Sequence, residues 1–327
     1  MFARIPGLLV LGVLLLSIQG CAPSVYAVDP PEASSYVFDG AGSQSDSHLN
    51  FVDLREDQYT AFTSGALPMG LTHNGETLDP VDFITKYTIA ELAARGISVS
   101  AGSSEATDVE INKIVMRNHR AMGFSPFTTV TMFSANILAP GGHHRVGSFF
   151  MRGKVPVWSF DEVIEPTMNQ PLELLVKELA AKINMVLYGK SISDATVKML
   201  IDKVNSDPAA ALAYLDVYQL GFSNNPLAID ALAKMTGSDH EYIRLAAISS
   251  LGTINAHGQV EQLITLFNGD GFWQDRAMAV KSLGDLAVMG NERAMTFLQN
   301  DVEPKLQGET AVGAGWTREI LGLYLRN

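Results

Sequence analysis

Few side chains in this 327-residue sequence have the types and spacing that chemistry requires. Cys21 is the only cysteine, so neither a disulfide nor a cysteine-based metal site can form within one chain. His143 and His144 follow the pair Gly141-Gly142 and come nearest to a pair of metal ligands. Adjacent residues of a strand point to opposite faces, and no cysteine or carboxylate nearby completes a ligand set. We therefore predict no metal site.

The familiar local motifs of catalytic centres are also missing. The sequence contains no G-x-S-x-G, no H-E-x-x-H and neither of the glycine motifs that bind phosphates or dinucleotides. His119 is expected on the polar face of a strand, and Asp161 and Glu162 are expected to be solvated residues before a helix. We predict that the protein is not an enzyme and has no catalytic residues and no dissociable cofactor.

The N-terminus carries the clearest functional indication. Arg4 precedes an apolar run of about eleven residues, from Leu8 to Ile18. This run is shorter than the roughly 20 apolar residues that a membrane-spanning helix needs. A basic residue, a short apolar run and small residues at its end are typical of a secretory signal peptide. The sequence therefore predicts export.

The segment Ile18-Gln19-Gly20-Cys21 resembles the lipobox of bacterial lipoproteins. The resemblance implies that residues 1–20 are removed and that Cys21 carries covalent lipid, whose three acyl chains would anchor the protein stably. Ala22 follows the cysteine, where an aspartate would imply retention in the inner membrane. The resemblance thus implies attachment to the outer membrane, with the body on the periplasmic side. The alternative is an ordinary signal peptide followed by an unrelated cysteine.

The net charge of the chain excludes one class of partner. The formal net charge is −12, and loss of Arg4 with the signal peptide leaves −12 − 1 = −13. Nucleic acids require basic patches, so we exclude them as partners.

The length suits two domains, which we place at residues 49–190 and 191–327. Residues 21–48, rich in Pro, Ser, Gly and Ala, are expected to form a flexible tether after the lipidated cysteine, with a short strand at 36–38.

Residues 49–190 alternate between strand and helix patterns. Asp79-Pro80 predicts the start of a helix that ends at Gly96, and regularly spaced apolar residues predict a second helix over 171–187. Strands are expected near 50–55, 97–100, 109–116 (with a bulge), 127–138 and 144–157, the last two joined by a turn at Gly141-Gly142. We expect an α+β domain, an antiparallel sheet with two helices on one face.

This domain resembles the YajG-like family of small bacterial lipoproteins. The resemblance rests on the strand Phe51-Val52-Asp53-Leu54-Arg55, the helix that ends in Ala-Arg-Gly at 94–96, the long central hairpin and the closing helix before Tyr188-Gly189. It covers somewhat less than half of the chain. The family brings no enzymatic residues to transfer.

Residues 191–327 lose the strand patterns and contain an internal repeat. The segment Arg244 to Gly252 (RLAAISSLG) matches Arg276 to Gly284 (RAMAVKSLG) at a spacing of 32, and further Leu-Gly pairs lie at 220–221 and 321–322. We expect each unit to be a helix pair, for example 242–254 with 260–267. The segment resembles short HEAT repeats, which implies an all-α stack with an extended surface for proteins or peptides. A helical bundle with chance Leu-Gly pairs is the alternative.

The turn at 268–275 is the most prominent point of this surface. It places Phe272 and Trp273 at a helix start, close to Arg276 and, one repeat earlier, Arg244. Exposed aromatic residues and arginines are favoured at interfaces, so these four residues are candidate partner-binding residues. The competing interpretation is that Trp273 packs on the preceding repeat and Arg276 pairs with a nearby acid such as Asp275.

Three functions remain in competition. The first is a non-catalytic, lipid-anchored scaffold or accessory factor that binds an envelope protein. The second is a carrier of lipid or a small apolar ligand, which requires a large apolar pocket between the sheet and its helices. The third, an enzyme acting on envelope polymers, requires a cleft with converging carboxylates.

Overall fold

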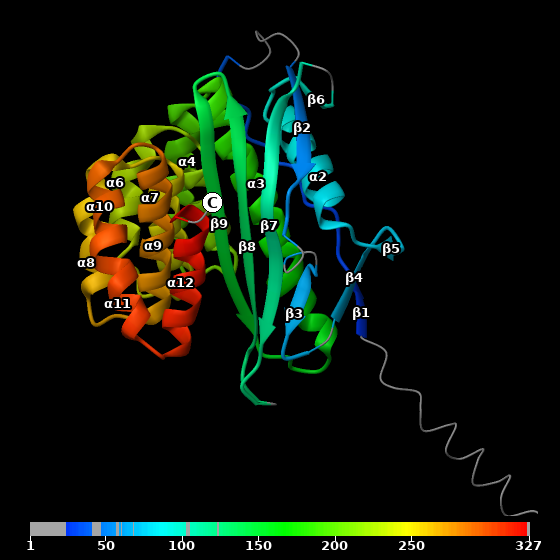
Figure 1. Ribbon diagram of the computed structural model, residues 1–327, viewed down its shortest axis with the longest axis vertical. Helices are drawn as coiled ribbons and strands as arrows, with labels where there is room; N and C mark the ends of the chain where they lie inside the picture. The colour runs from blue at the N-terminus through cyan, green and yellow to red at the C-terminus, as the bar shows by residue number, and fades with distance from the viewer. Residues whose placement is uncertain are drawn as a thin grey trace, which may run out of the picture.

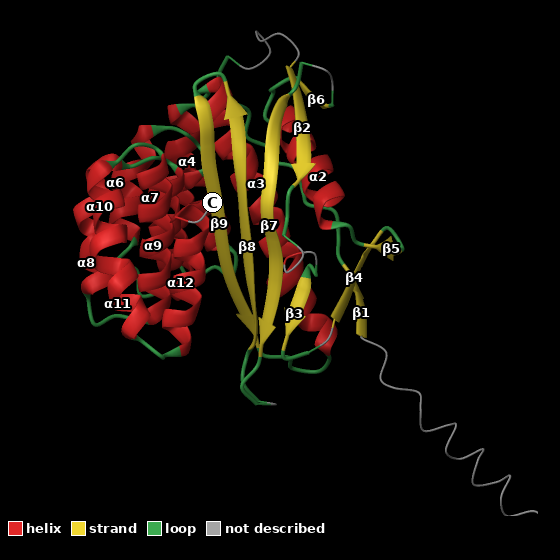
Figure 2. Cartoon of the chain, viewed as in Figure 1, coloured by secondary structure: helices red, strands yellow, loops and turns green. Residues whose placement is uncertain are grey.

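The structure is a computed structural model that describes residues 24–40, 47–56, 59, 61–67, 69–102, 105–122 and 124–325. Figures 1 and 2 show three layers: helices α2 and α3 behind a tall twisted sheet, and a stack of helices beside its β9 edge. The α+β domain followed by a helical region, as predicted, is present.

The sheet has the strand order β6-β2-β7-β8-β9, and the short strand β3 also pairs with β7. The bounds are β2 Ser47–Asp53, β3 Thr63–Gly65, β6 Val99–Ala101, β7 Thr107–His119, β8 Phe127–Ala139 and β9 Gly142–Lys154. Strands β7, β8 and β9 are antiparallel, but β2 is parallel to both β6 and β7, and β3 is parallel to β7. The sheet is therefore mixed, and the prediction of an antiparallel sheet was wrong. The reason is that α2 lies in the connection between β2 and β6, and a crossover helix returns the chain parallel to its first strand.

The long hairpin of β8 and β9 is formed around a tight turn. Ala139 pairs with Gly142 across the two-residue turn at 140–141, and Gly142 adopts a φ of 123° that favours glycine. The predicted bulge in β7 is confirmed by a shift of register between Ile111 and Lys113.

Two helices cover the rear face of the sheet. Helix α2 (Pro80–Ala94) begins as predicted: the Asp79 carboxylate accepts hydrogen bonds from the N–H groups of Val81 (2.8 Å) and Asp82 (3.0 Å). It ends before Gly96, whose φ is 85°. Helix α3 (Gln170–Ile183), continued by a π-helical turn at Asn184–Tyr188, is buried along nearly its whole length because α2, the sheet and α7 of the stack all contact it.

The segment expected to be a flexible tether is partly built into the fold. Strand β1 (Ser24–Ala27) pairs in parallel with β4 (Met69–His73), which continues into β5 (Glu76–Thr77). Phe38, within the short strand predicted at 36–38, is buried and forms an isolated bridge to Ile192. For residues 24–40 the tether prediction was therefore wrong, since Val28 and Phe38 bury apolar surface that offsets the cost of ordering.

The C-terminal region contains stacked helices. An inner row consists of α5 (Ala213–Gly221), α7 (Glu241–Thr253), α9 (Trp273–Val288) and α12 (Val312–Leu325), each in contact with the next. The remaining helices are α4 (Asp194–Ser206), α6 (Ile229–Met235), α8 (Val260–Asn268), α10 (Glu292–Phe297) and α11 (Glu303–Gly308). Helix α8 packs mainly on α9 and α6 on α7, so the expected pairing of 242–254 with 260–267 was shifted by one helix.

Glycines of the Leu-Gly pairs explain how closely the inner row packs. A Cβ atom added to Gly221 would lie 2.4 Å from Ser250 Oγ, and one added to Gly252 would lie 2.5 Å from Ser282 Cα. At Gly284 the clash would be with the ring of Tyr324, at 2.3 Å. The Leu-Gly pairs at 220–221, 251–252 and 283–284 therefore mark the places where the next inner helix crosses, so these three pairs have a packing role.

Candidate functional site

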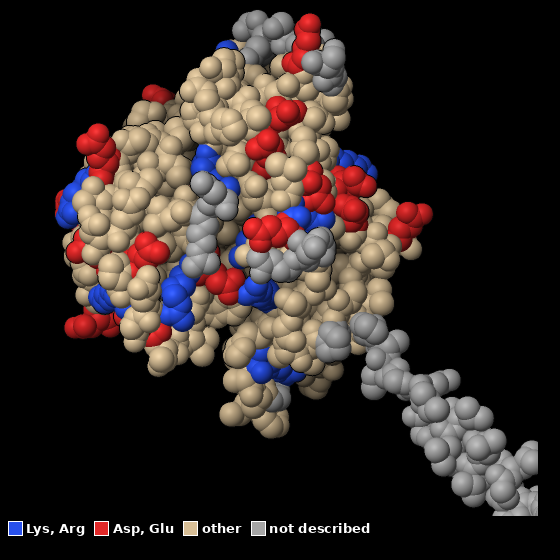
Figure 3. Space-filling view, viewed as in Figure 1, with Lys and Arg blue, Asp and Glu red and all other residues tan. Residues whose placement is uncertain are grey.

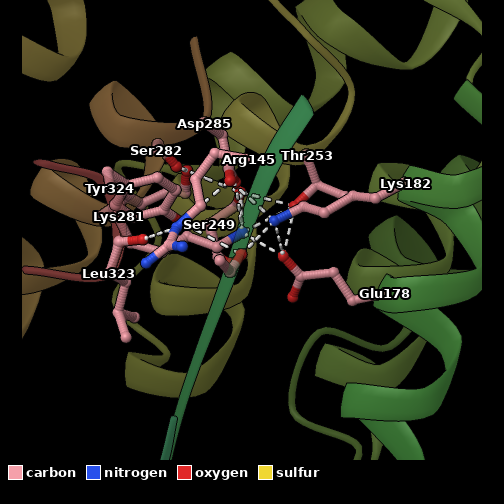
Figure 4. A network of polar contacts seen from close by, with 12 residues as sticks. Arg145, Glu178, Lys182, Ser249, Thr253, Lys281, Ser282, Asp285, Leu323 and Tyr324 are labelled. Atoms are coloured by element: carbon pink, nitrogen blue, oxygen red, sulfur yellow. Dashed lines mark hydrogen bonds and ion pairs between the residues drawn. The ribbon is translucent and has the colours of Figure 1, made fainter. Parts of the chain in front are cut away.

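Four ionised side chains are buried together where α3 meets α9 (Figure 4). Lys281 Nζ lies 2.7 Å from Glu178 Oε1 and 2.8 Å from Asp285 Oδ2. Lys182 Nζ lies 2.7 Å from Glu178 Oε1 and 2.7 Å from Asp285 Oδ1. Two positive and two negative charges make the cluster neutral. With Tyr324, which also binds Asp285, we call these residues the core ion network.

Helical spacing positions the four charges. Glu178 and Lys182 are one turn apart on α3, and Lys281 and Asp285 are one turn apart on α9. Because the two helices face each other, each lysine contacts the acid of its own helix and the acid of the other. The network thus links the α+β domain to the helical stack through a closed set of ion pairs.

Tyr324 extends the network to the last helix and to the sheet. Its hydroxyl lies 2.9 Å from Asp285 Oδ1 and 3.2 Å from the carbonyl oxygen of Gly147 in β9, which Lys182 Nζ also contacts. A Cβ atom on Gly147 would lie 2.8 Å from the Tyr324 ring, so this strand position needs a glycine. The contacts hold α3, β9, α9 and α12 at one point.

The local field keeps Glu178, Lys281 and Tyr324 in their ordinary ionisation states. Desolvation opposes the charge on Glu178, but Lys182 and Lys281 outweigh it and lower the pKa of the Glu178 carboxyl. Burial likewise opposes the charge on Lys281, yet Asp285 and Glu178 raise its pKa. Burial and the neighbouring Asp285 raise the pKa of Tyr324 well above its usual value, so the phenol remains neutral. These directions suit a fixed structural link, whereas a general acid or base needs a pKa near the working pH.

The sequence contains a sign of this network that the repeat analysis missed. In the aligned segments Arg244–Gly252 and Arg276–Gly284, the position of Ser249 is taken by Lys281. A lysine inside a run of alanines and aliphatic residues in a buried helix must have ionic partners. The run Leu172–Ile183, with Glu178 and Lys182 one turn apart between apolar residues, shows the same feature.

A polar cavity of about 510 Å³ lies beside the network, on the front face of the sheet. Strands β7, β8 and β9 form its floor, α12 forms one wall and the segment around Tyr59 contributes to the other; the lining residues are Leu54, Glu56, Tyr59, Asn112, Lys113, Arg117, Ser134, Arg145, Glu319, Gly322 and Leu323. Figure 3 shows basic and acidic side chains gathered on this face between the helical stack and the sheet. We call this cavity the α12 cleft.

Cations outnumber acids among the lining residues that the structure describes. Lys113, Arg117 and Arg145 supply three positive charges, against two negative charges on Glu56 and Glu319, although the chain as a whole has a net charge of −12. Arg117 Nη1 lies 2.5 Å and Lys113 Nζ 3.4 Å from the Glu319 carboxylate. An incoming carboxylate could share these cations with Glu319, so the cleft is suited to a polar ligand with an acidic group.

Arg145 connects the α12 cleft to the core ion network. Its Nε donates to the carbonyl oxygen of Leu323 at 2.7 Å, one residue before Tyr324. Burial lowers the pKa of Arg145. Arg145 therefore ties the floor of the α12 cleft to the last turn of α12, next to Tyr324.

The four predicted partner-binding residues lie at the α7–α9–α12 end of the stack and have different environments. Phe272 is 67% exposed, with the Arg244 guanidinium 5.5 Å from its ring centroid. Trp273 is partly buried and packs on α12, where a Cβ atom on Gly313 would lie 2.7 Å from its ring. Trp273 thus packs on the following inner helix, α12.

The two arginines of this group join consecutive repeats. Arg244 Nε lies 3.0 Å from the Asp275 carboxylate, and Arg276 Nη2 lies 3.1 Å from Glu309 Oε1. The acid expected for Arg276 is therefore bound by Arg244. Phe272 alone of the four presents most of its surface to solvent.

The remaining sequence predictions concern Cys21 and metal binding. Cys21 and residues 1–20 lie outside the described residues. His143, which is exposed, and His144, which is half-buried, are the second and third residues of β9, and no group of three or more His, Cys, Asp or Glu that could hold a metal occurs among the described residues. Within the same ranges, no helix is both long enough and apolar enough to cross a bilayer.

Comparison with known proteins gives little further information. No family model matches the sequence, and no curated protein matches it. A crystal structure of protein XCC0632 from Xanthomonas campestris, of the family model DUF330, aligns over 48% of this chain and 92% of its own length, with a TM-score of 0.33 and 11% sequence identity. A similarity at this level supports no conclusion about fold or function.

Proposed function

We propose that this protein is a non-catalytic lipoprotein, anchored by lipid on Cys21 to the periplasmic side of the outer membrane, that binds an envelope protein in the α12 cleft. Within this proposal the α+β domain is YajG-like and the stack is a set of short HEAT-like repeats. The occupant of the cleft is a polypeptide segment that carries at least one carboxylate.

The observation that carries the proposal is the construction of the α12 cleft. One wall is the last helix of the stack and the floor is the sheet, so both parts of the chain contribute to one surface. The core ion network beside it fixes α12 against β9. A preformed cleft loses little entropy on binding, which favours recognition of a partner.

The position of the cleft also bears on the competing functions. A carrier of apolar ligands would need an apolar cavity between the sheet and α2 and α3, whereas this cavity lies on the opposite face and is lined mainly by polar and charged groups. An enzyme would need groups poised to exchange protons, whereas Glu178 and Lys281 are held in their charged states. Both observations favour the binding function.

Site-specific photocrosslinking in cells tests the proposal. A photoreactive amino acid replaces Asn112 in the floor of the cleft, with Cys21 intact, and a matched control carries it at the exposed Lys234 of α6. We expect one defined protein adduct from position 112, its loss in the variant Arg117→Glu, and no such adduct from position 234. Equal capture at both positions, or an adduct with lipid alone, would contradict the proposal. Metabolic labelling with an alkyne fatty acid, compared between the wild type and Cys21→Ser, tests the anchor separately.

A further inference from the structure

Two neighbouring turns at one end of the sheet expose large apolar side chains. Phe124 in the β7–β8 loop is 95% exposed, and Trp158, after β9, is 92% exposed. The exposed apolar residues around them are Met122, Val155 and Val157. We call residues 120–122, 124–126 and 155–159 the apolar tips. Monomeric soluble proteins rarely gather such side chains in one exposed region without a binding role.

Local hydrogen bonds build this exposure into both turns. The Glu162 carboxylate accepts from the N–H groups of Val157 and Trp158, each at 2.8 Å, which lowers its pKa. In the other turn, Ser125 Oγ accepts from Met122 N at 2.9 Å, and Ser125 N donates to Met122 O at 3.0 Å. Both turns therefore hold their aromatic residues away from the core.

Strand register places the two apolar tips side by side. Phe127 pairs with Lys154 at the end of the β8–β9 ladder. Phe124 lies three residues before Phe127, and Trp158 lies four residues after Lys154. Figure 1 shows both loops at the foot of the sheet, opposite the β8–β9 turn.

The N-terminal strand reaches the same end of the molecule. The Tyr26 ring lies 5.0 Å from the ring of Phe160, which is two residues beyond Trp158. Ser24, the first residue of β1, pairs with Met69, and Leu67 N donates to Asn118 Oδ1 at 2.8 Å near the end of β7. Three peptide units separate Ser24 from Cys21, so their Cα atoms are at most about 11 Å apart. The lipid anchor would therefore emerge beside the apolar tips.

We propose that the apolar tips insert into the headgroup region of the phospholipid bilayer that holds the lipid on Cys21. This inference rests on the proposed anchor and adds an orientation: the foot of the sheet faces the membrane and the β8–β9 turn faces away. Aromatic residues favour this region of a bilayer, and a few exposed apolar side chains beside a covalent lipid add to its hold.

Charge at the tips fits the same occupant. Arg120 directly follows the last residue of β7, and Lys154 is the last residue of β9; their long side chains can reach lipid phosphates while the apolar residues enter the bilayer. Arg120 Nε also donates to Ser125 O at 3.4 Å, so it can support the turn and face the phosphates together.

The test uses thiol labelling, which the sequence makes specific because the only native cysteine is blocked once it is acylated. Ala121→Cys places an environment-sensitive fluorophore in one tip and leaves Phe124 and Met122 in place. His143→Cys places the same fluorophore in the β8–β9 turn as a matched control. Both lipidated full-length proteins are compared in detergent-free vesicles of phosphatidylethanolamine and phosphatidylglycerol.

We expect a blue shift and a several-fold rise in emission at position 121 on transfer to vesicles, quenching by lipids with spin-labelled headgroups, and no change at position 143. The variants Phe124→Asp and Trp158→Asp should reduce the shift at 121 while the protein stays anchored. Water-like emission at 121 in vesicle-bound protein would overturn the orientation and leave the anchor intact. Equal shifts at 121 and 143 would also overturn it. Crosslinking of position 121 to a protein in cells, without a vesicle response, would assign the tips to a protein partner instead. Mass analysis that finds Cys21 unmodified would refute the proposed anchor itself.

Discussion

The core ion network and the arginine pairs of the repeats both connect neighbouring helices, but they differ in burial and in whether they follow the repeat. The arginine pairs are Arg244–Asp275, Arg276–Glu309 and Arg293–Glu261, with partners 31 to 33 residues apart, and they range from partly buried to fully exposed. The core ion network is buried and does not follow the repeat. Repetition thus accounts for the stacking of similar helices, while a single departure from it, Lys281 in place of serine, marks where the stack joins the sheet.

Removing one charge from the core ion network should have the largest effect on stability. Lys281→Ala leaves Glu178 and Asp285 buried with one cation between them, and we expect a loss of about 3–5 kcal/mol in the free energy of unfolding. Urea denaturation followed by circular dichroism measures it.

The exposed pair Arg293–Glu261 supplies the matched control. Arg293→Ala removes a cation from the same stack, and we expect no measurable change because both side chains are solvated. Similar losses in the two variants would contradict the distinction between the network and the arginine pairs.

The next largest loss of stability is expected from substitutions at the close crossings of the inner helices. Gly252→Ala places a Cβ atom 2.5 Å from Ser282 Cα and should destabilise the protein by about 1–3 kcal/mol, because α7 and α9 must move apart. Gly258→Ala is the control, since no atom lies within 4 Å of the added methyl group. The comparison uses thermal unfolding, and a neutral Gly252→Ala would show that the helices are less tightly packed than described.

Acidification should weaken the core ion network. The pKa of Glu178 is lower in the folded protein than its ordinary value of 4.5, so its contribution is complete above that value and is lost as the pH falls through the folded pKa. Each extra proton taken up on unfolding costs at most about 1.4 kcal/mol per pH unit. Denaturation between neutral pH and pH 3 measures the slope. The double variant Glu178→Gln/Lys281→Met, which removes one charge of each sign, should show a shallower slope; an identical slope would exclude Glu178 as a contributor.

The smallest effect is expected from the arginine pairs. Arg244→Ala removes the cation that pairs with the buried Asp275 carboxylate and should cost about 1–3 kcal/mol, less than the loss of a charge from the core ion network. Its neighbour Phe272 is largely exposed, so Phe272→Ala should leave the denaturation midpoint unchanged. A loss from Arg244→Ala as large as that from Lys281→Ala would remove the contrast between the two kinds of ion pair.

Local patterns predicted the strands β2, β6, β7, β8 and β9 and the helices α2 and α3, whereas the short strands β1, β3, β4 and β5 were not predicted. Asp79-Pro80 and Gly96 marked the ends of α2, Gly141-Gly142 marked the long hairpin, and apolar spacing marked α3, because caps, turns and periodicity act over a few residues. The direction of β2 could not be predicted in this way, since it depends on how α2 carries the chain back to β6. The structured segment 24–40 was missed for a similar reason: its composition suggests a linker, but Phe38 is buried against residues far along the chain.

The same distinction between local patterns and long-range packing applies to the candidate site. The sequence by itself determined the presence of Cys21 in its lipobox-like setting, the repeat at a spacing of 32 and the unusual Lys281 within it. Only the tertiary structure decided that Lys281 meets Glu178, about a hundred residues earlier, and that Arg117 and Glu319 face each other across the α12 cleft. The reason is physical: a buried charge in a sequence shows that a partner is required, but the identity of that partner depends on how distant helices pack.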